Sequence, residues 1–329
     1  MKITILDDYQ DTIRTLPSFA KLKYHDVTVW TDHTKDTDIL ADRLRDTEAL
    51  ILYRERTPIR APLIDRLDRL RIISQVGWYP HIDIDACTRR GIIVSSHMMP
   101  GRPSYATAEL NWGLIIAAMR RIPQEDAAMR AGRWQAFPPG TALRGKTLGI
   151  YGYGRIGPVV AGYGKAFGMN VIVWSREASL AKARADGFTA AASKHAFFAE
   201  ADVLSIHLAL NEATRSIITA ADLALMKSSA LIVNTSRAGL IAPGVLTTAL
   251  RSGRPRMAAL DVFDDEPVTG ADDPLLAMDN VVCTPHIGYV ELGGLDGMFG
   301  VSFDQVLAYA HGEPVNVINS DALAHARRA

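Results

Sequence analysis

The sequence predicts an α/β protein built from two doubly wound parallel-sheet domains. Strand and helix signals alternate along most of the chain, and a glycine-rich turn follows one strand directly. At 329 residues the chain is long for one domain and comfortable for two. Short apolar strands separated by helices need crossover connections, and such connections build parallel sheets covered by helices.

The first hundred residues contain the strands and helices of one predicted sheet. Leu63, Leu67 and Leu70 are spaced to share one helix face. Ligands bind at the carboxyl ends of parallel strands, so we expect the loops 54–56, 76–81 and 97–101 to lie near a ligand. The predicted strands are 2–6, 27–30, 49–53, 71–75 and 92–94, and the predicted helices are 39–45 and 62–70.

The second predicted domain begins after a Pro/Gly cluster at 100–103. A long helix is expected at about 105–121, followed by an extended excursion at 123–144. Glycines at 288, 293, 294 and 297 suggest the return crossing, so we expect residues 1–101 and 292–329 to form a substrate-binding domain around a cofactor domain at 102–291. Further helices are predicted at 180–186, 220–226, 243–251 and 299–311, and further strands at 203–208, 230–234, 257–260 and 281–284.

A G-x-G-x-x-G motif at 152–157 lies between the strand 148–151 and a helix-like run, and a second strand follows at 171–174. This context predicts a dinucleotide site rather than a structural turn. The first glycine permits the tight turn, the second lets the backbone approach a pyrophosphate, and the third lets the helix pack on the strand. Amides at the helix start would face the phosphates. The loop residues are Gly152, Tyr153, Gly154, Arg155, Ile156 and Gly157.

Composition argues against several other classes. The formal net charge is zero, so nothing suggests nucleic acid or an acidic membrane surface as a partner. Cys87 and Cys283 lack a metal or redox spacing, which predicts no metal site and a reduced cytosol. Acidic residues appear at Asp7, too early for a signal peptide, and the apolar stretch 114–119 is too short to span a bilayer. We therefore expect a cytoplasmic protein.

Four stretches carry a family resemblance: the glycine loop, Val233–Arg237, Ala259–Pro267 and Thr284–Gly288. With these motifs in this order, the chain resembles the D-isomer-specific 2-hydroxyacid dehydrogenases over essentially its whole length. The resemblance implies a Rossmann domain inserted into a flavodoxin-like substrate domain. It also implies an active site in the cleft between the domains, and a homodimer.

Three side chains match the chemistry of 2-oxo acid reduction. Arg237 follows a strand and offers a planar fork that suits a carboxylate. His286 follows another strand and can change charge near neutral pH. Glu266 could accept the other imidazole proton, orient the ring and favour its charged form. The family gives these positions the same roles. Singly, such residues are more often structural, so the functional interpretation depends on the three together.

Cofactor choice depends on the end of the strand 171–174. An NAD site of this type usually has an acidic residue there, whereas this chain has Ser175 and Arg176, which favours NADP(H) over NAD(H). Glu177 argues the other way unless it turns outward; Ser175 could also serve a plain ribose, and Arg176 could be a surface residue. The resemblance places Asp261, otherwise a turn acid, at the nicotinamide carboxamide. It adds Thr107, His207, Thr235 and Gly288 to the cofactor-binding residues.

The resemblance also implies that backbone N–H groups of Val76, Gly77 and Trp78 hold the substrate carboxylate. Relatives usually have glycines where this chain has Val76 and Trp78. The bulky loop could accept a larger substrate, close the pocket against small ones, or pack against the other domain. Arg54 could bind a second anionic group or lie at a solvated rim.

The sequence thus predicts an enzyme that interconverts a 2-oxo acid and an (R)-2-hydroxy acid with a nicotinamide cofactor. A dinucleotide-sensing, corepressor-like binding protein on the same fold is the alternative, because fold does not settle function. The intact Arg237, Glu266 and His286 favour the enzyme.

Overall fold

The computed structural model describes residues 1–98, 105–268 and 270–325. The chain forms two compact units, Met1–Gly101 with Val290–Ala329, and Arg102–Tyr289. The cluster 100–103 and part of the loop 97–101 lie outside the described residues. Of the glycines expected at the return crossing, those at 293, 294 and 297 lie inside the last long helix, and Gly288 precedes it.

The first unit contains a five-stranded parallel sheet with the order β2-β1-β3-β4-β5. This is the flavodoxin-like order, and its direction reverses between β1 and β3. Residues of β3 and β4 are buried throughout, as the two covered faces of such a sheet require. The strands are β1 (Lys2–Ile5), β2 (Asp26–Val29), β3 (Ala49–Ile51), β4 (Ile72–Val76) and β5 (Ile93–His97).

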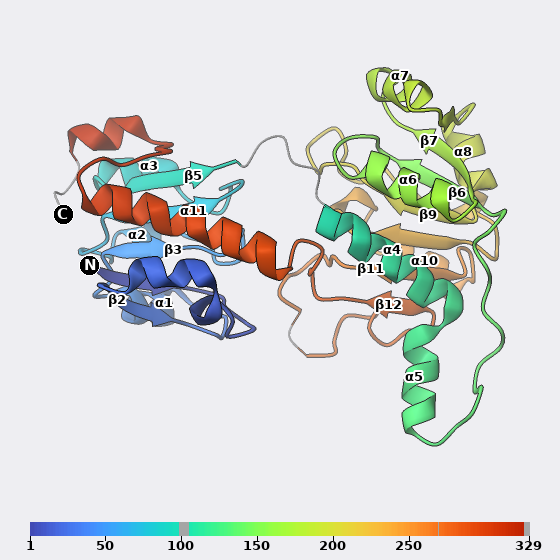
Figure 1. The fold of residues 1–329 in the computed structure, drawn as a ribbon, viewed down its shortest axis with the longest axis horizontal. Coiled ribbons are helices and arrows are strands. Elements are labelled where there is room, and N and C mark those ends of the chain that lie inside the picture. Colours follow the sequence, from blue (N-terminus) through green and yellow to red (C-terminus); the bar gives the residue numbers. More distant parts are fainter. Residues whose placement is uncertain (99–104, 269, 326–329) are drawn as a thin grey trace. The chain divides into compact units, whose positions relative to one another are not determined.

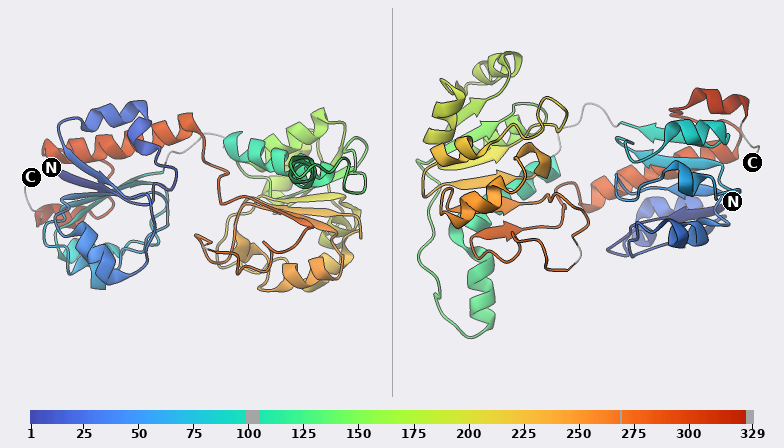
Figure 2. Two further views of the ribbon diagram at one scale, coloured as in Figure 1. Left: turned by 90° about the horizontal axis from the view of Figure 1, so that it is seen from below. Right: turned by 180° about the vertical axis from the view of Figure 1, so that it is seen from behind.

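Helices cover both faces of this sheet (Figure 2). α1 (Thr37–Leu44), α2 (Ala61–Ile64) and α3 (Ile84–Arg89) share one apolar core. α11 (Leu292–Ala310) crosses the other face with the 3₁₀ helix Pro17–Leu22 (Figure 1).

Two helix predictions in this unit were inaccurate, and α3 was not predicted. The helix expected at 62–70 ends at Ile64. Leu67 and Leu70 are nevertheless buried, because the turns that follow the helix place them in the core as a longer helix would. α11 begins seven residues before the predicted 299, because Glu291 caps it by accepting from the amides of Gly293 and Gly294.

The second unit contains a seven-stranded parallel sheet with the order β12-β11-β10-β9-β6-β7-β8. Its first six strands in chain order follow the Rossmann arrangement, and the direction reverses between β6 and β9. The strands are β6 (Thr147–Tyr151), β7 (Asn170–Trp174), β8 (Thr189–Ala190), β9 (Val203–Ile206), β10 (Leu231–Asn234), β11 (Met257–Leu260) and β12 (Val281–Cys283).

Two apolar clusters pack on this sheet, one under α4 and α6 and the other under α8, α9 and α10. The prediction of an extended excursion at 123–144 was wrong for its first part, because α5 continues to Arg130 and projects away from the sheet (Figure 1). The strand β8 and the helix α8 were not predicted. The helices are α4 (Tyr105–Arg120), α5 (Ile122–Arg130), α6 (Gly157–Ala166), α7 (Glu177–Ala185), α8 (Lys194–Glu200), α9 (Ala220–Leu225) and α10 (Val245–Arg251).

Candidate active site

The three glycines of the loop 152–157 have different surroundings. Gly152 has φ +99°, and a Cβ there would lie 2.8 Å from the carbonyl oxygen of His207. A Cβ at Gly157 would lie 2.3 Å from the carbonyl oxygen of Gly152. Around Gly154, by contrast, a Cβ would meet no described atom within 4 Å. The fold therefore requires the first and third glycines, and the second borders open space.

The other loop residues differ in burial. The Tyr153 side chain is buried and its hydroxyl donates to Asp186 Oδ2 at 2.8 Å. Burial, with this hydrogen bond, raises the pKa of Tyr153. Ile156 occupies the N-cap position of α6 and packs on the core, whereas Arg155 is exposed.

The end of β7 lies beside this loop, because the Gly152 amide donates to the Trp174 carbonyl oxygen at 2.9 Å. Ser175 is half-buried there, and the exposed Arg176 is the N-cap residue of α7. Glu177 accepts from Arg184 Nη1 at 2.6 Å on the exposed surface of α7. The acid nearest to the strand end is thus engaged in an ion pair along its own helix.

His286 and Glu266 form a close pair in the second unit. His286 Nδ1 lies 2.5 Å from Glu266 Oε2, and the Phe263 amide donates to Glu266 Oε1 at 2.9 Å. Burial raises the pKa of Glu266, but the hydrogen bond and charge of His286, the Phe263 amide and the charge of Arg237 together hold that pKa below its ordinary value. The carboxylate is therefore ionised at neutral pH.

Arg237 is held by the loop that follows β10. The Asn234 side chain donates to the Arg237 carbonyl oxygen at 2.9 Å and accepts from the Ser236 amide at 3.0 Å. The half-buried guanidinium donates to the Ser236 carbonyl oxygen at 2.7 Å and acts electrostatically on Glu266. Because β10, β11 and β12 are neighbours, the segments following them bring Arg237, Glu266 and His286 to one edge of the sheet.

Asp261 holds the segment that carries His286. Its Oδ1 accepts from the Thr284 hydroxyl at 2.6 Å and the Ile287 amide at 2.8 Å, and its Oδ2 accepts from the Gly288 amide at 2.8 Å. Burial raises the pKa of Asp261, while these hydrogen bonds oppose the shift. A Cβ at Gly288 would lie 3.2 Å from Thr107 Cγ2, so α4 lies against the same turn. Asp261 is fully buried, and its contact with a cofactor is still a prediction.

A polar group lies under this edge and joins the predicted Thr235 and His207 to two residues that were not predicted, Asn111 and Ser205. Asn111 of α4 donates to Ser205 Oγ at 2.9 Å and to Thr235 Oγ1 at 3.1 Å, and Ser205 Oγ lies 3.0 Å from His207 Nε2. Asn111 and Ser205 are fully buried. An asparagine sharing a helix face with Ala108 and Ile115 was the available signal, because a buried amide needs partners.

In the first unit, the turn after β4 is fixed by its neighbours. Gly77 has φ +103°, and its amide donates to the His97 carbonyl oxygen at 3.0 Å. Its carbonyl oxygen accepts from Ser96 Oγ at 2.7 Å, and Gln75 Nε2 donates to the Trp78 carbonyl oxygen at 2.6 Å. The Trp78 side chain is 69% exposed. A Cβ at Gly77 would lie 3.5 Å from Arg54 Nη1, so the guanidinium lies beside this turn.

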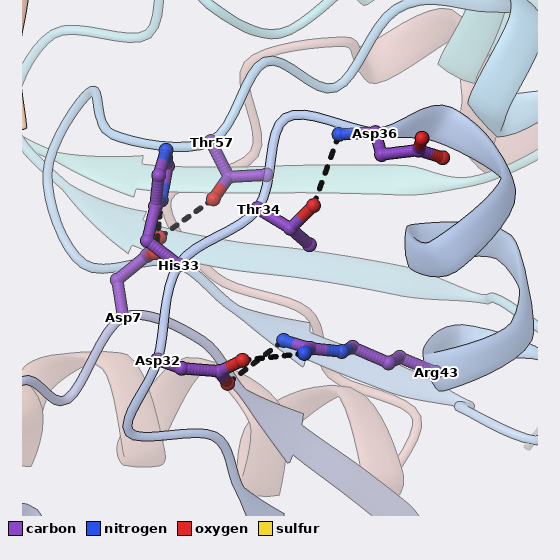
Figure 3. A network of polar contacts seen from close by, with 7 residues as sticks. All are labelled: Asp7, Asp32, His33, Thr34, Asp36, Arg43 and Thr57. Carbon is purple, nitrogen blue, oxygen red and sulfur yellow. Dashed lines mark hydrogen bonds and ion pairs between the residues drawn. The ribbon is translucent and has the colours of Figure 1, made fainter. Parts of the chain in front are cut away.

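Asp7 stabilises the segment that carries Arg54. Its carboxylate lies 2.7 Å from His33 Nδ1 and accepts from the Thr57 hydroxyl at 2.7 Å (Figure 3). Asp7 and Thr57 are each 2% exposed, so burial strengthens these contacts. The segments following β1, β2 and β3 are thereby joined at the carboxyl edge of the first sheet.

His81 lies below the same edge. Both of its ring nitrogens are buried without a hydrogen-bond partner among the described residues. Burial lowers its pKa to about 4, and Arg60 adds to the shift, while Glu55 and Asp7 oppose it. Of the bulky loop 78–81, His81 is therefore a core residue of the first unit, whereas Trp78 is exposed.

Among the described residues, no group of three or more His, Cys, Asp or Glu residues could hold a metal ion. In the same part of the chain, no helix has the length and apolarity needed to cross a membrane.

The chain is similar to known proteins of one family. Residues 112–288, all within the second unit, match the family model described as D-isomer specific 2-hydroxyacid dehydrogenase, NAD binding domain. The chain is 38% identical to a glyoxylate reductase of Aeropyrum pernix, with 92% of each chain covered. It is 38% identical to a D-3-phosphoglycerate dehydrogenase of Methanocaldococcus jannaschii, with 88% of this chain and 53% of that protein covered.

A solved structure shares the fold over nearly the whole length. It is a phosphoglycerate oxidoreductase from Vibrio cholerae O395, 46% identical, with a TM-score of 0.90 and coverage of 95% of this chain and 99% of that one. The names of these relatives do not favour the corepressor-like alternative. The predicted fold is confirmed. The chain belongs to the D-isomer-specific 2-hydroxyacid dehydrogenase family, the NAD-dependent oxidoreductases of 2-oxo and 2-hydroxy acids.

Proposed function

We propose that the chain reduces a 2-oxo acid reversibly to the (R)-2-hydroxy acid, with Arg237, Glu266 and His286 as its catalytic residues. The observation that carries the proposal is the 2.5 Å contact of His286 Nδ1 with Glu266, under the positive charge of Arg237. A bound reduced nicotinamide supplies the hydride. Arg237 binds the substrate carboxylate and so orients the carbonyl carbon. Glu266 engages Nδ1, which leaves Nε2 of His286 to protonate the forming alkoxide.

The substrate loop of the first unit supports a refined assignment. The Gly77 amide donates to the His97 carbonyl oxygen, whereas the Trp78 amide has no hydrogen-bond partner among the described residues and could meet a carboxylate. We assign substrate binding to Val76, Gly77 and Trp78, with Arg54 beside them. Arg54 has φ +62°, a strained conformation for arginine, which Asp7 helps to maintain through Thr57.

A panel of 2-oxo acids, assayed by nicotinamide absorbance, tests both assignments. Glyoxylate, phosphohydroxypyruvate and phenylpyruvate differ in size and in whether they carry a second anion. If Arg54 binds a second anion, Arg54→Ala should raise KM for phosphohydroxypyruvate about 10-fold, as expected for a lost charge-assisted hydrogen bond, and leave KM for glyoxylate unchanged. Equal effects on both would refute that role. Absence of turnover on every acid would refute the proposed function.

Cofactor preference is a separate proposal: we infer that the chain favours NADP(H). No acid follows β7 directly, Arg176 is exposed at the N-terminus of α7, and Glu177 is paired with Arg184. A 2′-phosphate there would meet a guanidinium and helix amides. Ser175→Asp with Arg176→Ala should move the ratio of kcat/KM toward NADH, whereas Arg251→Ala, on an exposed end of α10, should leave it unchanged. A wild-type preference for NADH, unmoved by the double change, would refute the inference.

We also propose a homodimer formed through α5 and the segment after it. α5 projects from the second unit (Figure 1), and it carries Ile122 at 50% and Met129 at 58% exposure, with Trp134 beyond it at 76%. Apolar side chains gathered on a projecting element are typical of protein interfaces. Light scattering after size exclusion should give twice the mass of the chain, and Met129→Glu with Trp134→Glu should give the monomer. A wild-type monomer would refute the proposal.

A further inference from the structure

A buried chain of polar side chains connects α4 with the carboxyl edge of the second sheet. Asn111 of α4 contacts Ser205 of β9 and Thr235, which follows β10, and Ser205 contacts His207. Asn111 and Ser205 are fully buried and Thr235 is 6% exposed. Each hydrogen-bonding proton of these buried side chains must therefore be matched to an acceptor within the protein.

Counting donors determines the direction of the hydrogen bonds. Asn111 Nδ2 donates to Ser205 Oγ and Thr235 Oγ1, which uses both of its protons. Among the described residues, Asn111 Oδ1 has one donor, the Ser205 hydroxyl at 3.1 Å. If that hydroxyl donated to His207 instead, a fully buried amide oxygen would lose its partner, at a cost of about 1–3 kcal/mol. Ser205 therefore donates to Asn111, and His207 Nε2 must carry the proton that it shares with Ser205.

The other ring nitrogen then follows. A neutral histidine has one protonated nitrogen, so Nδ1 of His207 is an unprotonated acceptor. Burial lowers the pKa of His207 to about 3, so the ring is neutral near pH 7. No hydrogen bond engages Nδ1 within the described residues, and Nδ1 is not among their buried unpartnered atoms.

The position of His207 identifies the kind of group that would meet this acceptor. Its amide donates to the Tyr151 carbonyl oxygen at 2.7 Å, and its carbonyl oxygen lies where a Cβ on Gly152 would clash. It is thus beside the first glycine of the loop, where the order of the sheet reverses and a pyrophosphate binds. Phosphate oxygens are acceptors and cannot pair with a bare nitrogen. The nearest donors on either side of a pyrophosphate are ribose hydroxyls.

We propose that Asn111 and Ser205 are positioning residues that fix His207 in its Nε2–H tautomer, so that Nδ1 accepts a hydrogen bond from a ribose hydroxyl of the dinucleotide. The second half of this proposal rests on the cofactor-binding role expected for His207. The first half concerns the ligand-free protein and is independent of that role.

The tautomer can be measured directly by nitrogen–proton NMR on ligand-free protein with ¹⁵N-labelled histidine. The His207→Leu variant identifies the signal by its loss. We expect the wild type to show a protonated Nε2 and a bare Nδ1, and we expect Ser205→Ala and Asn111→Leu to give mixed tautomers. His195, exposed on α8, is an internal control whose signals should stay the same. A wild-type Nδ1–H tautomer would overturn the proposal even if neither variant folds, as would unchanged tautomers in folded variants.

The contact with the ribose is tested by titrating NADH and NADPH into the same proteins and following protein fluorescence. We expect His207→Leu and Ser205→Ala to raise Kd about 3- to 10-fold for both cofactors, the range of one net hydrogen bond. Wild-type Kd in a folded His207→Leu protein would overturn the ribose contact and leave the proposed reaction untouched. Absence of turnover in a wild-type protein that has the Nε2–H tautomer would instead count against the proposed reaction.

Discussion

Replacing Gly154 by alanine should weaken cofactor binding without destabilising the fold. An added Cβ at Gly154 would meet no described atom within 4 Å, and the φ of this residue lies outside the left-handed region. The ligand-free protein should therefore tolerate the methyl group, and Gly→Ala at a compatible position stabilises by about 0.4–1 kcal/mol through the unfolded chain. We expect an unchanged or slightly higher Tm.

The loss of affinity follows from contact distances. Amide donors bind a phosphate oxygen at about 2.7–3.2 Å, whereas a methyl carbon keeps atoms at about 3.5–4.0 Å. A pyrophosphate cradled by the loop must shift to clear the methyl group and lose at least one hydrogen bond to a charged acceptor. Such a bond contributes about 1.5–3 kcal/mol, so Kd for the cofactor should rise about 10- to 150-fold.

Two variants bracket the measurement, with Kd from fluorescence titration and Tm from thermal unfolding. Gly162 lies on the exposed side of α6 with no described atom within 4 Å of an added Cβ, so Gly162→Ala should leave Kd unchanged. Gly157→Ala should lower Tm, because its Cβ would lie 2.3 Å from the Gly152 carbonyl oxygen. Wild-type affinity in a folded Gly154→Ala protein would refute the pyrophosphate cradle.

Three further predictions concern charged and titratable groups. Arg237→Ala should raise KM and lower kcat together, and His286→Ala should mainly lower kcat by about 10²- to 10⁴-fold; steady-state rates near wild type in a folded His286→Ala protein would exclude it as the acid. Glu266→Gln removes the anion beside His286, so the alkaline limb of 2-oxo acid reduction should move to lower pH; an unmoved limb, with hydride transfer rate-limiting, would exclude Glu266 from this role. Because burial lowers the pKa of His81 from 6.5 to about 4, the unfolded chain binds this proton first, and stability falls as pH falls through that window. Between pH 7 and pH 5 the free energy of unfolding should fall by about 2 kcal/mol more in wild type than in His81→Phe, as measured by denaturant unfolding. An equal fall in the two proteins would contradict this prediction.

The parallel pairing of the strands and the three candidate catalytic residues were accessible from the sequence because both depend on local patterns, whereas the order of the strands was implied only by the family resemblance. Strand-end residues such as Arg237 lie at one sheet edge once the strands are parallel, and the G-x-G-x-x-G context identifies the strand at which the order reverses. Helix boundaries were less accessible. Leu67 and Leu70 are buried whether or not the helix continues, so apolar spacing did not distinguish a helix from a series of turns. Glu291 started α11 early through a cap that hydropathy does not reveal.

The polar interior shows a different limit. An asparagine on the apolar face of a helix predicts a buried amide that needs hydrogen-bond partners, but the helical spacing does not identify those partners. Asn111 finds them 94 residues away at Ser205 and 124 residues away at Thr235, and both contacts exist only because α4 packs where β9 and β10 end. The tautomer of His207 is a further step removed, since it depends on which of two oxygens receives one hydroxyl proton. The tautomer is therefore determined by the donors and acceptors that the fold brings together, and no spacing along the chain predicts it. Ser205→Ala removes one hydroxyl group from this polar group. It would therefore separate a role of Ser205 in orienting His207 toward the cofactor from a role in packing.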